Sequence, residues 1–285
     1  MNYRHVYHAG NFADVLKHIV LTRIIIHLQR KDKAFRVVDT HAGIGRYDLA
    51  SEEAQKTGEW RDGIGKILQE KIPTPIQPLL QPYLDLLKSD ERGQLLSFYP
   101  GSPLIARSLL RKQDRLSLTE LHPTDVEQLR KLFAGDYQVR VNELDGWLAL
   151  GGHLPPKEKR GVVLIDPPFE NTDDFEKLEQ GLAVAHKKWS GGTYCLWYPV
   201  KLQRSTDDFA ERIKALDIPK TLRVELHIRR PSNNSDTNGL NGCGLIIVNP
   251  PFTLYDELSL LLPWLSKLLQ QGAGNGFTLN WLNGE

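Results

Sequence analysis

The sequence has few cysteines and no long hydrophobic run, and these absences limit the class of protein. Only two cysteines occur, Cys195 and Cys243, each in an apolar stretch typical of a strand. Their spacing does not suit a zinc site, so we expect buried, reduced thiols in a cytoplasmic protein. No stretch approaches the roughly 20 apolar residues of a membrane helix. The N-terminus also lacks the apolar core of a signal peptide.

Strong net charge is absent as well. The formal charge is +1, so the composition gives no overall indication of nucleic-acid binding. Residues 1–36 are locally basic, because they hold seven lysines and arginines against two aspartates, together with four histidines. Such a face could bind phosphates, although an ordinary solvated helix explains this charge equally well. The apolar fraction of 40% is enough for a full hydrophobic core.

Strands alternate with helices along most of the chain. Apolar residues at helical spacing predict a long helix over 12–31. Short apolar stretches then predict strands at 35–39, 115–119, 137–141, 162–166, 193–197, 222–228 and 244–248, and helical patterns follow most of them. This alternation predicts an α/β fold with a doubly wound, mostly parallel sheet. The last two of these strands are expected to form an antiparallel hairpin, joined by the polar stretch 229–243 as a mobile loop. This loop is expected to contact a nucleic-acid substrate or to shield the pocket.

Residues 51–98 interrupt the alternation. They contain several prolines, no convincing strand, and helical patterns at 64–69 and 79–88. We therefore predict an inserted helical subdomain at 51–98, placed after the first strand–helix unit. Residues 1–50 and 99–285 would form the catalytic domain, with 1–31 as an N-terminal segment that closes the site.

The stretch Val162–Phe169 is the most informative in the chain. A buried strand ends in Asp166, Pro167, Pro168 and Phe169, at the sheet edge where α/β proteins bind ligands. The Asp166 carboxylate and the Pro167 carbonyl can accept hydrogen bonds from an exocyclic amine, and the Phe169 ring can stack on a planar base. The tetrapeptide resembles the D/N-P-P-Y/F/W signature of methyltransferases that modify amino groups of nucleobases.

A second N-P-P-F sequence begins at Asn249 and also follows an apolar strand. A methyltransferase sheet needs three further strands after the catalytic one. The chain supplies three after Asp166 but only a helix and a glycine-rich tail at 272–276 after Asn249. We therefore expect Asn249 to end the last strand and Asp166 to be catalytic.

The predicted strand at 35–39 leads into a glycine turn that contains Gly43 and Gly45 and is expected to open a helix. Glycines let the backbone approach a ligand closely, so Gly43 is a candidate cofactor contact. The D-x-x-x-G-x-G form resembles methyltransferase motif I. Glu120 and Asp145 follow the next two strands and could hold ribose hydroxyls and, with Gly146, an adenine edge. Each acid alone is more often a helix cap, but three acids at successive strand ends favour a nucleoside site.

The opening sequence from Tyr3 to His18 closely resembles that of bacterial 23S rRNA adenine-N6 methyltransferases of the RlmJ type. The sequences D-T-H-A-G at 39–43, Y-P-G-S-P at 99–103 and E-L-H-P at 120–123 resemble the same family, and the resemblance covers essentially the whole chain. It implies a Rossmann-like class I fold that binds S-adenosylmethionine and releases S-adenosylhomocysteine.

The resemblance also implies a role for individual residues. Cofactor contacts are expected at His18, His41, Ser102, Glu120, Asp145, Gly146 and Asp166, with Asp166 as the catalytic acid/base. Tyr3 is implied as an RNA contact, and Arg4, His5 and Lys17 lie in the same opening segment. The expected partner is 23S rRNA, naked or in an early assembly intermediate; the protein is expected to act as a monomer without a metal ion or a membrane.

Two alternatives remain open from the sequence. The D-P-P-F tetrapeptide cannot distinguish adenine N6 of rRNA from guanine N2 of rRNA or adenine N6 of DNA. A non-enzymatic RNA-binding protein with the same fold is a second alternative, although the presence of Glu120, Asp145 and Asp166 is evidence against it.

Overall fold

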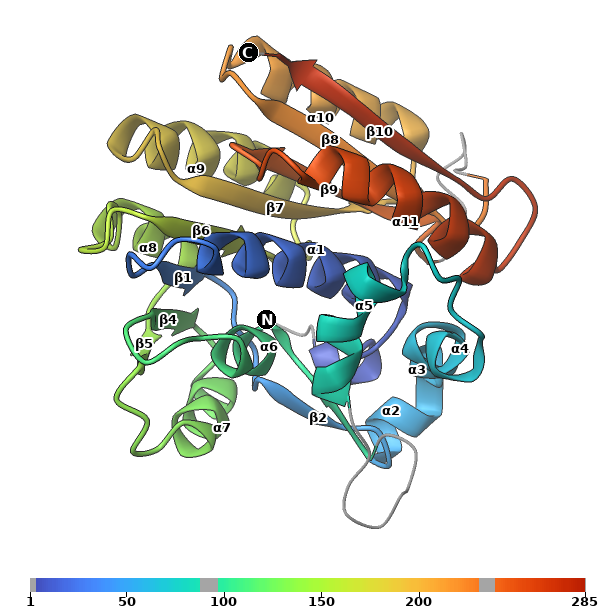
Figure 1. The fold of residues 1–285 in the computed structure, drawn as a ribbon, viewed down its shortest axis with the longest axis horizontal. Helices are drawn as coiled ribbons and strands as arrows, with labels where there is room; N and C mark the ends of the chain where they lie inside the picture. Colours follow the sequence, from blue (N-terminus) through green and yellow to red (C-terminus); the bar gives the residue numbers. More distant parts are fainter. Residues whose placement is uncertain (1–3, 88–96, 231–238, 285) are drawn as a thin grey trace.

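The computed structural model describes residues 4–87, 97–230 and 239–284, and an eight-stranded sheet lies at its centre (Figure 1). The strands of this sheet are β1 (Arg36–Asp39), β4 (Arg115–Glu120), β5 (Val139–Glu143), β6 (Gly161–Ile165), β7 (Thr193–Val200), β8 (Thr221–His227), β9 (Gly242–Val248) and β10 (Gly276–Asn283). Their spatial order is β10-β8-β9-β7-β6-β1-β4-β5.

Five neighbouring strands, β5, β4, β1, β6 and β7, run parallel. Strand β9 lies between β7 and β8 and is antiparallel to both, so β8 and β9 form the predicted hairpin. The chain moves from β1 toward β5 in one direction and from β6 toward β8 in the other. The order therefore reverses beside β1, as in Rossmann-like folds, where ligands bind at this switch point. The predicted fold class is confirmed.

Strand β10 is not predicted by the sequence, because the chain after the last predicted helix is interpreted as a tail with a glycine-rich turn at 272–276. It pairs antiparallel with β8 at the edge of the sheet. An edge strand lacks the continuous buried stretch that identifies a central strand, and all residues of β10 are at least partly exposed. Consequently the sheet has four strands after Asp166, not three.

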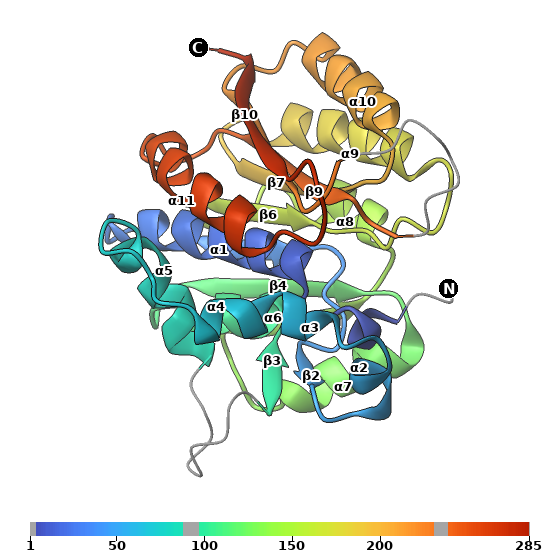
Figure 2. The ribbon, with the colours of Figure 1, turned by 90° about the vertical axis from the view of Figure 1, so that its right-hand side faces the viewer.

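Helices cover both faces of the sheet, as Figure 2 shows. Helices α1 (Phe12–Gln29), α6 (Ser102–Ser108) and α11 (Leu254–Leu268) lie on one face. Helices α8 (Gly146–Gly152), α9 (Asp174–Lys188) and α10 (Gln203–Ala215) lie on the other, and α7 (Pro123–Leu132) packs beside β4 and β5. Alternate residues of a strand face opposite layers. In β6, Val162 and Leu164 accordingly join the core beneath α1, whereas Val163 and Ile165 join the core beneath α9.

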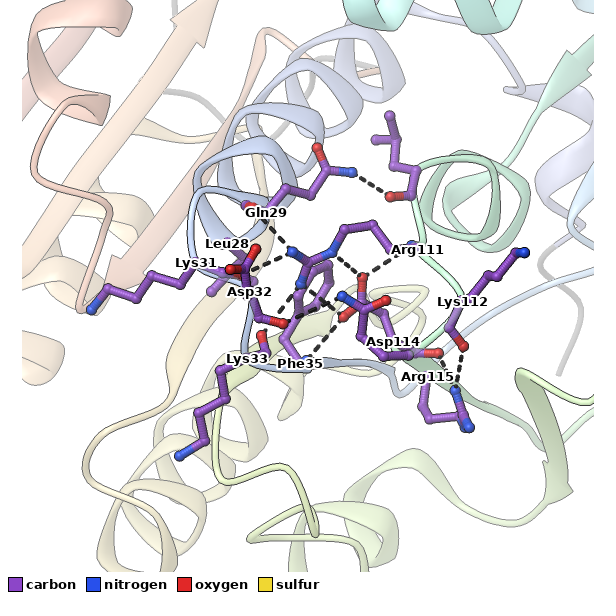
Figure 3. Close-up of polar contacts among 12 residues, drawn as sticks. Leu28, Gln29, Lys31, Asp32, Lys33, Phe35, Arg111, Lys112, Asp114 and Arg115 are labelled. Carbon is purple, nitrogen blue, oxygen red and sulfur yellow. Dashed lines mark hydrogen bonds and ion pairs between the residues drawn. The ribbon is translucent and has the colours of Figure 1, made fainter.

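Helix α1 is buried along most of its length, and both of its ends are fixed. At its start the Asn11 side chain accepts hydrogen bonds from the amides of Ala13 (2.9 Å) and Asp14 (3.0 Å). At its end Arg111 donates to the carbonyls of Gln29 and Lys31, and the fully buried Asp114 fixes the Arg111 guanidinium (Figure 3). These contacts hold the helix, and therefore its N-terminal residues, against the sheet. No helix of the described residues is long and apolar enough to cross a membrane.

The inserted segment contains α2 (Glu52–Thr57), α3 (Glu59–Asp62), α4 (Ile64–Gln69), α5 (Gln77–Leu84) and a 3-10 turn, Asp85–Leu87. Strands β2 (Arg46–Asp48) and β3 (Phe98–Pro100) pair antiparallel at its base. Leu80 and Tyr83 of α5 are fully buried in the same core as α1. We therefore propose that the predicted subdomain 51–98 folds together with the catalytic domain.

The position of the insertion corrects one prediction. The glycine turn does not open a helix; it leads into β2, because Gly43 and Gly45 have left-handed backbone conformations with φ of +60° and +75°. Helix α6, which packs against β1, begins only after the insertion. The Gly101 amide donates a hydrogen bond to the Gly45 carbonyl at 2.9 Å. This bond holds the start of α6 beside the glycine turn. The insertion therefore interrupts the first strand–helix connection.

Candidate active site

A cavity of about 700 Å³ opens at the carboxyl ends of the parallel strands. Residues from the start of α1 and from the ends of β1, β4, β6 and β7 line it. The predicted site residues that line it are His5, Lys17, His18, His41, Gly43, Ser102, Glu120, Asp166, Pro167 and Phe169. Arg4 is exposed and is not among the lining residues, and Tyr3 lies outside the described residues.

The Asp166 loop lies where β6 ends, at the switch point of the sheet. Pro167 is buried, whereas Asp166 and Phe169 are partly exposed toward the cavity. Phe169 adopts φ of +52°, a left-handed conformation that is unusual for a bulky residue and often marks a functional turn. Its ring meets those of Phe175 and Trp197 edge-on, at centroid distances of 5.0 and 5.7 Å. These contacts hold the loop in one shape.

Lys17 connects α1 to this loop. Its ammonium group donates a hydrogen bond to Asp166 Oδ2 and forms an ion pair with Asp14 Oδ1 at 2.8 Å. Burial lowers the pKa of Lys17, but the two carboxylates outweigh burial and raise the pKa well above its ordinary value. The ammonium is therefore charged, and it fixes one oxygen of Asp166.

Asp14 is the centre of this charged cluster, and sequence reasoning did not select it. It is 1% exposed, and Oδ2 accepts hydrogen bonds from the Gly10 amide and from the His5 ring, each at 2.9 Å. Burial raises the pKa of Asp14, but the positive charges of His5 and Lys17 outweigh burial and hold this pKa well below the ordinary range. An acid in the first turn of a helix is common because it complements the helix dipole, so its position does not mark Asp14 as a site residue. The only sequence feature that could have pointed to Asp14 is its spacing of three residues from Lys17.

His18 lies one turn from Asp14 and is almost completely buried. Its Nδ1 is 2.7 Å from the Tyr99 hydroxyl, which is 2.9 Å from the Tyr83 hydroxyl. Burial lowers the pKa of His18 to about 3, so the ring is neutral at pH 7. His18 lines the cavity, where it offers a neutral imidazole, and its expected contact with the cofactor stays a prediction.

The turn after β1 presents a second acid. Asp39 is buried and accepts hydrogen bonds from Ser102 Oγ at 2.7 Å and from the His41 amide at 3.3 Å. Burial raises the pKa of Asp39 to about 7. Ser102 lines the cavity, so the start of α6 and the end of β1 meet at its wall.

Glu120 ends β4 and faces the same wall. Its two oxygens accept hydrogen bonds from the amides of Gly43 (2.7 Å) and His122 (2.8 Å). Because each carboxylate oxygen has a second lone pair, Glu120 can still accept hydrogen bonds from a ligand hydroxyl. Burial raises the pKa of Glu120 in spite of these donors. Gly43 has φ of +60°, and a Cβ there would lie 2.3 Å from the Tyr47 hydroxyl, so this turn favours glycine.

Asp145 and Gly146 do not line the cavity among the described residues. The Asp145 side chain accepts a hydrogen bond from the Trp147 amide at 2.7 Å and therefore caps α8. A Cβ on Gly146 would lie 2.3 Å from the Thr40 carbonyl oxygen, so this glycine lets α8 approach the turn after β1. Trp147 then meets the His41 ring edge-on at 5.2 Å. Gly146 and Trp147 thus pack against the His41 ring, and His41 lines the cavity.

The second N-P-P-F sequence lies at the opposite end of the strands from the cavity, near the amino ends of the parallel strands. Strand β9 is antiparallel, and Val248 pairs with Tyr194 near the start of β7. Asn249 follows β9 and binds the carbonyls of Ser190 and Gly192, each at 2.8 Å. Phe252 is 81% exposed. As predicted, Asn249 ends a strand and takes no part in the cavity, but that strand is not the last.

Within residues 4–87, 97–230 and 239–284 no cluster of three histidine, cysteine or acidic side chains could hold a metal ion. Organic cofactors are bound by cavities of roughly 300–1,000 Å³ lined by apolar groups and a few polar ones. The Asp39–Ser102 and Gly43–Glu120 pairs supply such polar groups on one wall. Lys17 and Asp166 face them from α1 and β6.

Comparison with known proteins agrees with this geometry. The model of the family described as "Ribosomal RNA large subunit methyltransferase D, RlmJ" matches residues 32–283. The chain belongs to the RlmJ family. It is 44% identical to ribosomal RNA large subunit methyltransferase J of Escherichia coli over 284 residues, covering 99% of each chain. The Haemophilus influenzae protein of the same name is 42% identical, with complete coverage of both chains.

The crystal structure of a protein from Legionella pneumophila has the same overall fold. The two chains are 38% identical, with a TM-score of 0.85, and the match covers 96% of this chain and 98% of the other. The resemblance found in the opening sequence is therefore confirmed at the level of the family. The alignments with the two relatives cover 99% and 100% of this chain and so include the N-terminal segment and the insertion, whereas the family model begins at residue 32.

Proposed function

We propose that this RlmJ family member transfers a methyl group from S-adenosylmethionine to N6 of a specific adenine in 23S ribosomal RNA. The relatives in Escherichia coli and Haemophilus influenzae are named as ribosomal RNA large subunit methyltransferases. The observation that carries the proposal is the position of Asp166, whose Oδ2 is fixed by Lys17. Its Oδ1 has no hydrogen-bond partner among the described residues and lines the cavity, so it can accept a hydrogen bond from an amine.

The residues would act as follows. The target adenine must leave its stack for N6 to enter the cavity. Asp166 Oδ1 would accept one N6 hydrogen and the Pro167 carbonyl the other, which directs the nitrogen lone pair toward the methyl group. The Phe169 ring would pack against the base. Bound S-adenosylmethionine supplies an electrophilic methyl group on sulfur and leaves as S-adenosylhomocysteine. Because the methylated amine is acidic, Asp166 or a water molecule can take its proton after the new bond forms.

The opposite wall would hold the cofactor. Glu120 would accept hydrogen bonds from the ribose hydroxyls, and His18 lines the same cavity with a neutral ring. Catalysis would then come mainly from positioning and electrostatics. The proposed cofactor contacts are His18, His41, Gly43, Ser102, Glu120, Asp145, Gly146 and Asp166, and the proposed RNA contacts are Tyr3, Arg4, His5 and Lys17. We further infer a cytoplasmic monomer that acts on rRNA either naked or in an early assembly intermediate.

The test is methyl transfer from labelled S-adenosylmethionine to unmodified 23S rRNA, with naked DNA assayed alongside. The product is digested to nucleosides, and the wild type is compared with Asp166→Ala. Asp208→Ala serves as the control, because Asp208 is an exposed acid on α10. Label in N6-methyladenosine that is lost only in Asp166→Ala would support both the base and the role of Asp166. Label in another nucleoside, or only in DNA, would contradict the proposed substrate.

A further inference from the structure

The charged side chains that line the cavity are distributed unevenly. The acidic ones come from α1, α3, the end of β4, α7 and the loop after β6, namely Asp14, Glu59, Glu120, Asp125, Asp166 and Glu170. Lys17 is buried between two of these acids. Among the described lining residues the other lysine and arginine are Lys201, which follows β7, and Arg229, which follows β8. Both therefore lie on the side of β6 that faces away from β1 and Glu120.

Asn241 links the backbones of Lys201 and Arg229. It is buried, and its backbone amide donates to the Val200 carbonyl at 2.9 Å. Its side-chain amide donates to the Lys201 carbonyl at 2.7 Å. The Arg229 amide in turn donates to the Asn241 carbonyl at 3.3 Å. A single buried residue thus forms hydrogen bonds with the backbones of both Lys201 and Arg229. The position of these two backbones therefore does not depend on contacts of the Lys201 and Arg229 side chains.

Both cations keep free hydrogen-bonding capacity. The Arg229 Nη2 donates to Gln271 Oε1 at 3.2 Å, and its buried Nε has no partner among the described residues. A guanidinium has five N–H donors, so several remain for a ligand. Lys201 is exposed, and no acidic residue of the described chain forms an ion pair with it. Unpaired cations at a cavity mouth favour an anionic ligand.

An aromatic ring lines the same cavity as these cations. Trp197 of β7 is partly exposed, lines the cavity, and meets the Phe169 ring at 5.7 Å with an angle of 73° between the planes. A cationic groove next to an aromatic platform is the common arrangement for binding single-stranded nucleic acid, because phosphates pair with the cations and bases stack on the rings.

We propose that Trp197, Lys201 and Arg229, here called the β7–β8 wall, bind the RNA strand that flanks the target adenine. This inference rests on the proposed function. When a base enters an enzyme pocket, its neighbouring phosphates stay at the mouth. Arg229 and Lys201 hold these phosphates, and Trp197 packs against the nucleotide beside Phe169. The acidic wall at Glu120 repels phosphates and so helps to orient the strand.

The inference is tested with Arg229→Gln, Lys201→Gln and the double variant, using unmodified 23S rRNA. Arg204→Gln is the matched control, because Arg204 lies on α10 with its side chain 92% exposed and outside the cavity. For the double variant we expect the KM for RNA to rise about tenfold or more, with kcat and the affinity for S-adenosylmethionine nearly unchanged. The salt dependence of RNA binding should weaken, by about 0.7 in the log–log slope for each lost phosphate contact.

The result that overturns the inference is a double variant with the same KM for RNA and the same salt slope as Arg204→Gln. Arg229→Lys retains the charge and should keep most of the affinity, which separates charge from local packing. If the wild type transfers no methyl group to rRNA, the proposed function fails. Filter binding of the same rRNA to the wild type and the double variant then still decides whether the β7–β8 wall binds RNA.

Discussion

Lys17 and Asp166 are 149 residues apart in the sequence, yet their side chains form a hydrogen-bonded ion pair inside the cavity. This pair joins the N-terminal helix to the loop that carries the proposed catalytic acid. Asp14 completes it from the other side, at 2.8 Å from the Lys17 ammonium. Because α1 precedes the first strand of the sheet, a segment outside the central strand–helix repeat determines the orientation of Asp166.

Replacing Lys17 with Met should strongly reduce methyl transfer. Met keeps most of the side-chain volume but removes the charge that fixes Asp166 Oδ2, so the carboxylate can rotate. Misplacement of a reacting group can cost about 10²-fold in rate, and we expect a fall in kcat of about that size. Single-turnover transfer to 23S rRNA measures it.

Lys66→Met is the matched control, because Lys66 lies on α4 in a partly exposed ion pair with Asp62 at 3.2 Å. The explanation fails if both variants keep wild-type kcat. Lys17→Met is also expected to lower stability, since Asp14 loses a partner at a buried position. Activity is therefore compared only after urea unfolding shows that the variant is folded under the conditions of the assay.

The two P-P-F sequences provide an internal comparison. Phe169→Ala should raise the KM for RNA or lower kcat by roughly tenfold or more, since stacking of a base on an aromatic ring contributes about 1–3 kcal/mol. Phe252→Ala should leave both unchanged, because Phe252 lies 81% exposed at the opposite end of the strands from the cavity. Steady-state kinetics with 23S rRNA measure both variants. Equal effects of the two substitutions would contradict the assignment of the site to Asp166.

The sequence predicted most strands because buried parallel strands form continuous apolar stretches bounded by turns. It also predicted that Asp166, and not Asn249, lies at the ligand-binding end of the sheet, and the structure has Asp166 in the cavity lining and Asn249 outside it. The argument counted too few strands, because β10 at the exposed edge was missed. Topology supplies the stronger reason. Strand β9 is antiparallel, so Asn249 cannot lie at the edge where the parallel strands end.

Contacts between distant segments could not be predicted. The helix expected directly after Gly45 is α6, which starts at Ser102 and returns through the pairing of β2 with β3. Asp145 caps α8 through the Trp147 amide, and its expected contact with the cofactor stays a prediction. Asp14 was overlooked because the partner that reveals its role, Asp166, is brought to Lys17 only by the folded sheet.

The neutral His18 should make the protein less stable in acid. Its pKa is about 3 in the folded state against an ordinary 6.5. Below pH 6.5 the unfolded chain therefore binds a proton that the folded chain does not, and stability falls as the pH falls. His18→Asn removes this titration, so between pH 7 and pH 4.5 it should lose about 2–3 kcal/mol less stability than the wild type. Urea unfolding at each pH measures this, and parallel curves for the two proteins would contradict it.

Asp39 should have the opposite effect. Burial raises its pKa to about 7 from an ordinary 3.8, so between these values the folded state holds a proton that the unfolded state has lost. Its contribution to stability is therefore full below pH 3.8 and is lost as the pH rises toward 7. Asp39→Asn should gain about 2–3 kcal/mol relative to the wild type between pH 5 and pH 8. Ser102→Ala, which retains the carboxyl group, is the control and should keep the pH dependence.

Gly146 and Gly151 lie in the same helix, α8, but only one of them is confined. A Cβ at Gly146 would lie 2.3 Å from the Thr40 carbonyl oxygen and 2.7 Å from the His41 ring, whereas a Cβ at Gly151 meets nothing within 4 Å. Gly146→Ala must therefore push α8 away from the turn after β1 and displace His41. We expect weaker binding of S-adenosylmethionine, by about tenfold or more, and a lower melting temperature.

Gly151→Ala should leave cofactor binding unchanged and raise stability by about 0.5–1 kcal/mol, because alanine favours a helix over glycine. Titration calorimetry with S-adenosylmethionine and thermal unfolding measure both variants. If Gly146→Ala loses stability but binds the cofactor normally, the close approach of α8 to His41 serves packing alone. Gly146 would then no longer be a proposed cofactor contact. If it loses cofactor affinity while remaining folded, a glycine outside the cavity lining determines the position of a ring within it.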